Sequence, residues 1–174
     1  MVMQATDESK SSSNQAAHLG VRRTGGRPET TADITVDGTA TGVLMGGNLD
    51  AIRTEIGAGL PSLRGAILFL EHQRGTGLGE VDRALAQLTR SGAVDGLHGV
   101  ALGQFLGFER DAHDPTLGGW GIRDVLRDRL AGLGVPVLGG LPAGHGTNPP
   151  TIPLGTQATI DTATGTLTVL PAVV

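Results

Sequence analysis

Glu71 and His145 are the residues of this 174-residue chain whose types and settings best fit catalytic chemistry. Glu71 directly follows the apolar run GAILFL, which is typical of a buried strand, and His145 lies in the glycine-rich segment GGLPAGHG. Both are expected at the carboxyl ends of parallel strands, where open α/β sheets bind their ligands. A histidine that is oriented by a carboxylate is part of a nucleophilic triad, so acyl transfer is the first chemistry to consider.

Each of the two residues also has a simpler structural interpretation. Glu71 could cap the loop after its strand, and His145 could be an ordinary loop histidine. The flanking Gly144 and Gly146 favour the functional interpretation, because they allow a close approach of the backbone to a neighbouring group. His72 follows Glu71 directly and is expected to point to the opposite face of the sheet.

A second hypothesis is nucleotide binding by the segment Gly75-Thr-Gly-Leu-Gly79, with Asp95 as a ribose ligand. The segment lies between a predicted strand and a predicted helix. Its glycines are spaced G-x-G-x-G instead of G-x-G-x-x-G, and four polar residues separate it from the strand. The pattern therefore favours a plain loop over a phosphate site.

A third cluster, at Asp111, His113 and Asp114, has the residue types of a metal site. Neighbouring ligands in a polar loop cannot all face one ion, so a surface loop is expected. We expect neither a metal nor a cofactor.

Composition excludes several classes of function. Thirteen Lys+Arg against seventeen Asp+Glu give a net charge of −4, which argues against nucleic-acid binding. The chain has no cysteine, so thiolate nucleophiles, disulfides and Cys-ligated zinc are excluded. No apolar run has the length of a signal peptide or a membrane span, and a cytoplasmic protein without membrane contact is expected.

The elements that must position these residues follow from local patterns. Residues 1–30 are expected to be a flexible tail and linker, because Gln4–Gln15 is polar and Ser-rich and glycines follow it. The ordered domain is expected to span residues 31–174. Its first element is predicted to be a β-hairpin about Asp37-Gly38, and Asn48 is predicted to cap a short helix. The predicted hairpin pairs Ala32–Val36 with Thr39–Met45, and the helix contains Leu49, Ile52 and Ile56.

Strands and helices then alternate to the end of the chain, where a Thr-rich hairpin is predicted. The fold class is α/β, with a largely parallel central sheet and antiparallel hairpins at both ends. The predicted strands are Gly65–Leu70, Val100–Leu102, Pro136–Leu138, Thr156–Ile160 and Thr166–Leu170, and the predicted helices contain Val81, Leu85 and Leu88, and Trp120, Val125, Leu126, Leu130 and Leu133.

Several of these segments, taken in order, resemble the LD-carboxypeptidases and the related microcin C self-immunity peptidases. The resemblance extends from about Gly38 to Leu170. It rests on the segments Gly46-Gly47-Asn48-Leu49, Ile67-Leu68-Phe69-Leu70-Glu71, VDRALAQLTRSG, GVALGQF and GLPAGHGTNPPTIPLG.

The resemblance implies a serine peptidase of two domains. A flavodoxin-like amino-terminal domain carries the nucleophilic serine, and a swivelling β/β/α carboxy-terminal domain carries the acid and the base. By position, Glu71 matches the acid and His145 the base, while Gly47 and Asn48 match a substrate-binding segment beside the cleft. Family members are often homodimers, so a homodimer is a possible assembly.

The nucleophile is the departure from the family. None of the serines, which are Ser9, Ser11, Ser12, Ser13, Ser62 and Ser91, follows a strand in an elbow that leads into a helix. We therefore expect a carboxy-terminal domain without its amino-terminal nucleophile domain, inactive alone.

The resemblance leaves two substrates open. These are the terminal D-Ala amide of a murein tetrapeptide, as in peptidoglycan recycling, and the peptidyl-nucleotide amide of microcin C. Few aromatics are available to stack a nucleobase, which favours the murein peptide. A binding domain without catalysis is the alternative from another class.

Overall fold

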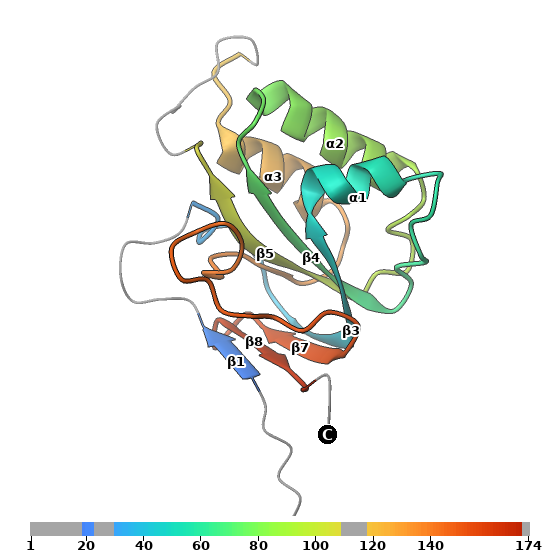
Figure 1. Ribbon diagram of the computed structural model, residues 1–174, viewed down its shortest axis with the longest axis vertical. Helices are drawn as coiled ribbons and strands as arrows, with labels where there is room; N and C mark the ends of the chain where they lie inside the picture. Colours follow the sequence, from blue (N-terminus) through green and yellow to red (C-terminus); the bar gives the residue numbers. More distant parts are fainter. Residues whose placement is uncertain (1–18, 23–29, 109–117, 172–174) are drawn as a thin grey trace, which may run out of the picture.

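A computed structural model describes residues 19–22, 30–108 and 118–171, which form a mixed α/β fold (Figure 1). The expected tail at Gln4–Gln15 and the acidic loop at Asp111–Asp114 lie outside these residues. Within the described part, one sheet has the strand order β1-β8-β7-β3-β4-β5-β6-β2. The strands are β1 (Leu19–Arg22), β2 (Thr35–Val36), β3 (Thr39–Asn48), β4 (Ala66–Gln73), β5 (Gly99–Leu106), β6 (Val137–Leu138), β7 (Gln157–Asp161) and β8 (Thr166–Val169), and the helices are α1 (Leu49–Glu55), α2 (Leu78–Arg90) and α3 (Ile122–Ala131).

The centre of the sheet is parallel, as the alternation of strands and helices predicted. Strand β3 pairs in parallel with β4, β4 with β5, and β5 with β6, whereas β7 pairs antiparallel with β3 and β8. The carboxyl ends of the parallel strands therefore lie along one edge of the sheet. The predicted terminal hairpin is confirmed as β7 and β8.

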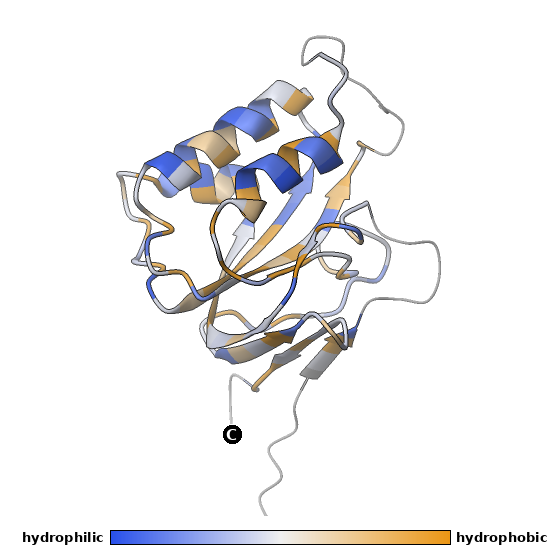
Figure 2. Ribbon diagram, turned by 180° about the vertical axis from the view of Figure 1, so that it is seen from behind, coloured by the Kyte–Doolittle hydropathy of each residue, from blue (hydrophilic) through white to orange (hydrophobic). Residues whose placement is uncertain are grey.

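The two faces of the sheet are covered differently. All three helices lie on one face (Figure 1), where Leu68 and Leu70 of β4 belong to the larger core. Ile67 and Phe69 of β4 belong to a second core with residues of β1, β7 and β8, so the sheet curls over its other face. In Figure 2 hydrophilic and hydrophobic residues alternate along the helices, as expected for helices that bury one side.

The start of α1 confirms the predicted cap. The side-chain oxygen of Asn48 accepts hydrogen bonds from the backbone N–H groups of Asp50 (3.0 Å) and Ala51 (3.4 Å). Leu49 and Ile52 are the buried residues of this helix. Asn48 is also the last residue of β3, so the strand passes directly into the helix at the carboxyl edge of the sheet.

The prediction of a hairpin about Asp37-Gly38 is wrong, because the two segments do not pair with each other. β2 pairs antiparallel with β6, whereas β3 lies between β4 and β7. The turn is bonded instead to the β7–β8 connection: the N–H of Gly38 donates to the hydroxyl of Thr162 (2.9 Å), and the N–H of Thr162 donates to the carbonyl of Gly38 (3.2 Å). Long-range pairing has overridden the local turn signal.

Two further expectations are corrected. Leu19–Arg22, predicted to belong to a flexible tail, forms strand β1 and pairs antiparallel with β8, so the ordered domain begins before Thr31. Trp120 precedes α3 instead of packing within it, and it is 41% exposed.

Candidate active site

Strand β4 carries Glu71 within its length, because the strand continues beyond the apolar run to Gln73. Glu71 is 5% exposed, although a carboxylate is rarely buried to that extent without a partner. It pairs in register with Asn48 on β3. The acid is therefore fixed by the two central strands, near the carboxyl edge of the sheet.

His145 lies in the loop that follows β6. This loop runs along the end of β5, since the N–H of Leu141 donates to the carbonyl of Leu102 (3.2 Å) and the N–H of Gln104 donates to the carbonyl of Ala143 (2.8 Å). Strand β5 separates β4 from β6 in the sheet. The loop crosses the end of β5 and thereby brings His145 to Glu71.

The two candidate residues are in direct contact. The Nδ1 atom of His145 lies 2.6 Å from Oε2 of Glu71, so the expected approach of these residues is observed. An ionised carboxylate only accepts hydrogen bonds, so this contact suits an imidazole whose Nδ1 carries the proton. The side chain of Glu71 is 7% exposed and that of His145 is 46% exposed. Glu71 thus forms a buried support, and the imidazole reaches towards solvent.

A shallow hollow of about 210 Å³ opens in front of this pair. Gly47 lines it beside Glu71 and His145, with Phe69 and Leu154 on its apolar side. Asn48 does not line it, and its side-chain oxygen is used in the cap of α1. The structure therefore places Gly47 at the hollow, and Asn48 beside it.

His72 points to the helix face, as the strand alternation predicted. It is 1% exposed, and neither ring nitrogen has a hydrogen-bond partner among the residues that the structure describes. Its ring lies against Phe105 and Phe108, and its Nδ1 is 3.9 Å from a carboxylate oxygen of Asp50. Burial lowers the pKa of His72, and the negative charge of Asp50 opposes this shift.

One residue of the site was missed by the sequence analysis. Gln104 on β5 is 9% exposed, and its side-chain oxygen accepts a hydrogen bond from the N–H of Gly146 (2.8 Å). Local pattern gave no signal for it, because a glutamine within a strand has many ordinary explanations. Its contact with the residue after His145 depends on the return of the loop across β5.

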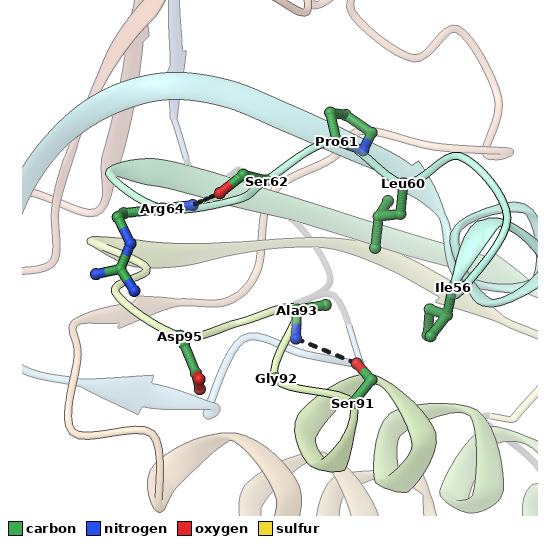
Figure 3. A pocket seen from close by; sticks show the side chains of 10 residues that line it. Ile56, Leu60, Pro61, Ser62, Arg64, Ser91, Gly92, Ala93 and Asp95 are labelled. Carbon is green, nitrogen blue, oxygen red and sulfur yellow. Dashed lines mark hydrogen bonds between the residues drawn. The ribbon is translucent and has the colours of Figure 1, made fainter.

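Ser62 and Ser91 do not lie at the edge of the sheet that carries the acid and the base. They line a different pocket, before β4 and after α2, at the amino ends of the strands (Figure 3). Both hydroxyls are used in local turns: Ser62 accepts from the N–H of Arg64 (3.3 Å), and Ser91 accepts from the N–H of Ala93 (3.2 Å). Neither serine has the setting of a nucleophile, which agrees with the sequence analysis.

The nucleotide hypothesis is not supported by the arrangement. Asp95 lines the pocket of Figure 3, whereas Gly75–Gly79 leads from the carboxyl end of β4 into α2, so the two are not brought together. The first turn of α2 carries Glu80, whose carboxylate binds Arg53 and disfavours a second anion there.

Two more findings bear on the class of protein. In the described ranges, no three His, Cys, Asp or Glu side chains come together as a metal site. Over the same part of the chain, no helix is long and apolar enough to cross a membrane.

Fold and site together define an α/β domain that presents a carboxylate–imidazole pair at the carboxyl edge of its sheet. The chain belongs to the LD-carboxypeptidase family, whose C-terminal domain matches residues 41–160. The match includes Glu71 and His145, and this confirms the resemblance found in the sequence.

Relatives in the same family are named for peptidase activity. The chain is 39% identical over 163 residues to a Streptomyces coelicolor protein named as a carboxypeptidase, covering 89% of this chain and 50% of that protein. It is 30% identical over 129 residues to a Bacillus subtilis protein named as a murein peptide carboxypeptidase, covering 74% of this chain and 39% of that protein. The chain thus spans half or less of these relatives.

Solved structures give the same result. The muramoyltetrapeptide carboxypeptidase from Oxalobacter formigenes superposes with a TM-score of 0.67 at 27% identity, covering 88% of this chain and 48% of that one. The microcin C7 self-immunity protein superposes with a TM-score of 0.60 at 27% identity, covering 79% and 40%. Both solved structures therefore share the fold of this chain.

Proposed function

We propose that this chain supplies the acid and the base of a serine-type L,D-carboxypeptidase, with Glu71 as the acid and His145 as the base. The observation that carries the proposal is the 2.6 Å contact between Oε2 of Glu71 and Nδ1 of His145. A buried carboxylate that holds Nδ1 leaves Nε2 as the ring atom available for proton transfer.

The nucleophile belongs to the flavodoxin-like domain of the family. In the proposed reaction, Nε2 of His145 takes the proton of that serine hydroxyl as the hydroxyl attacks the amide carbonyl. His145 then gives the proton to the leaving amine, and water hydrolyses the acyl-enzyme. Glu71 stays ionised, holds the imidazole tautomer and stabilises the imidazolium.

We assign the terminal D-Ala amide of a murein tetrapeptide as the substrate. The names of the Bacillus subtilis relative and of the Oxalobacter formigenes structure support a murein peptide. The hollow beside Glu71 and His145 would take one end of the peptide, against Gly47 and the neighbouring Asn48. The remaining contacts come from the nucleophile domain.

The test is a chimera in which the carboxy-terminal half of the Streptomyces coelicolor relative is replaced by this chain. We expect it to release D-Ala from murein tetrapeptide, measured by mass spectrometry, and to lose that activity with His145→Ala. The control is His98→Ala, which changes an exposed histidine bonded to the carbonyl of Thr41.

Two results would contradict the proposal. One is a folded chimera that releases no D-Ala. The other is turnover by the 174-residue chain alone that persists after contaminating peptidases are removed, since the chain is expected to need the second domain.

A further inference from the structure

A β-bulge in β5 lies directly beside Glu71. On either side of it, Leu70 pairs with Leu102, and His72 pairs with Phe105. One residue of β4, Glu71, is therefore opposed by the two residues between Leu102 and Phe105, which are Gly103 and Gln104. Bulges of this kind occur next to active sites, where they change the direction of a side chain.

The extra residue determines where Gln104 points. Leu102 and Phe105 both belong to the core beneath the helices, although they are three positions apart and regular alternation would put them on opposite faces. Gln104 would lie on the helix face of a regular strand. With the bulge, it lies on the face of Glu71 and the His145 loop, where its side-chain oxygen meets Gly146.

Gln104 holds this loop on both sides of His145. Its backbone N–H donates to the carbonyl of Ala143 (2.8 Å), and its side-chain oxygen accepts from the N–H of Gly146 (2.8 Å). The segment between these anchors contains only Gly144 and His145. Gln104 itself is 9% exposed, and its bond to Gly146 is partly buried, so this bond is partly shielded from water.

Gly146 fits this arrangement for a steric reason. A Cβ atom at position 146 would lie 2.3 Å from the side-chain oxygen of Gln104, and its backbone does not require a positive φ. The glycine is therefore needed for the close approach of Gln104 and not for an unusual backbone conformation.

We propose that Gln104 is a positioning residue for His145, which fixes the loop so that Nδ1 stays directed at Glu71. The meaning of this for catalysis rests on the function proposed above, in which His145 is the base. The positioning itself is a property of this chain and is measurable without turnover.

The first experiment uses NMR on the 174-residue chain and its Gln104→Met variant, which keeps the side-chain length and removes the strong acceptor. We expect exchange of the Gly146 amide to rise about tenfold or more, and the downfield Nδ1–H resonance of His145 to broaden or vanish. The control is Gln157→Met on β7, an exposed position, which should change neither signal. Unchanged signals in Gln104→Met would overturn the proposal.

Two more variants separate positioning from general stability. Gln104→Glu keeps an acceptor of the same length, so the protection of the Gly146 amide should be retained. Gly146→Ala pushes the side chain of Gln104 away from the loop and should cause the same NMR changes as Gln104→Met. It therefore tests the same contact if Gln104→Met folds poorly. Its control is Gly132→Ala, because position 132 has open space and an ordinary φ of −71°. If Gly146→Ala leaves the Nδ1–H resonance of His145 intact, the proposal is wrong.

The same variants in the chimera distinguish this inference from the proposed function. If both are right, Gln104→Met lowers kcat more than it raises KM, and Gln104→Glu recovers part of the loss. If Gln104→Met releases His145 in the NMR spectra while His145→Ala keeps full activity, the positioning is right and the proposed function fails.

Discussion

Gly144 packs directly against the side chain of Glu71. A Cβ atom at this position would lie 3.0 Å from Oε2 of Glu71 and 3.2 Å from its Cβ, and the backbone has a φ of +131°. The residue before the candidate base therefore has both a steric and a conformational reason to be glycine. The hydrogen bond between His145 and Glu71 needs this close approach of the loop to β4.

Gly144→Ala should destabilise the domain by about 1–3 kcal/mol, because a side chain is strained at this φ and meets the carboxylate. The midpoint of thermal unfolding should fall by roughly 3–10 °C. Gly132→Ala is again the matched control and should be close to neutral or slightly stabilising. A Gly144→Ala variant with the parent unfolding temperature would show that the loop moves freely away from Glu71.

The acid and the base should act as one unit. In the chimera, Glu71→Gln should lower kcat by about 10⁴-fold, since the carboxamide no longer selects the Nδ1–H tautomer of His145. The double variant Glu71→Gln/His145→Ala should be little worse than His145→Ala alone. Near-normal kcat in Glu71→Gln, with a lower unfolding temperature, would make Glu71 a structural cap of its strand.

Thr31 should contribute to stability through two buried hydrogen bonds. Its hydroxyl donates to the carbonyl of Gly103 (3.0 Å) and accepts from the N–H of Gly140 (2.9 Å), and the residue is 0% exposed. Thr31→Val leaves both backbone groups without this partner and should cost about 2 kcal/mol or more in urea unfolding. Thr41→Val, at an exposed hydroxyl on β3, is the control and should cost far less.

His72 should make the domain sensitive to acid. Burial lowers the pKa of His72 in the folded state, whereas the unfolded chain has the ordinary histidine pKa of about 6.5. Below that pH the unfolded state binds more protons than the folded state. The contribution of His72 to the free energy of unfolding is therefore fully present above about pH 6.5 and decreases as the pH falls.

Replacement of His72 by leucine should remove this part of the acid sensitivity. The measurement is the urea midpoint at pH 5 and pH 8 for the parent and for His72→Leu. The difference between the two pH values should shrink in His72→Leu and should be unchanged in His98→Gln, which alters an exposed ring. An unchanged difference in His72→Leu would show that other groups cause the acid sensitivity.

The local sequence pattern correctly predicted those elements that are determined by residues close together in the chain. The cap at Asn48, the buried run that became β4 and the Thr-rich terminal hairpin were visible because neighbouring residues determine them. The approach of Glu71 and His145 was also predictable, since the carboxyl ends of parallel strands share one edge.

Pairings between distant segments were not predictable in this way. Asp37-Gly38 has the composition of a hairpin turn, yet its partner is the β7–β8 connection. Strand β1 depends on β8 for its pairing, so its own residues gave little signal. Gln104 needed the bulge in β5, and no pattern of polar and apolar residues reveals a bulge before the sheet is known.

The insertion of β5 between β4 and β6 has a consequence for folding. The contact between Glu71 and His145 closes a loop of 74 positions, so forming it costs loop-closure entropy before its hydrogen bond is gained. Loss of the bonds between β5 and the loop after β6 therefore separates the pair and leaves Glu71 without an imidazole beside it. The Nδ1–H resonance of His145 can accordingly serve as a marker for molecules in which β4, β5 and the loop after β6 are assembled together.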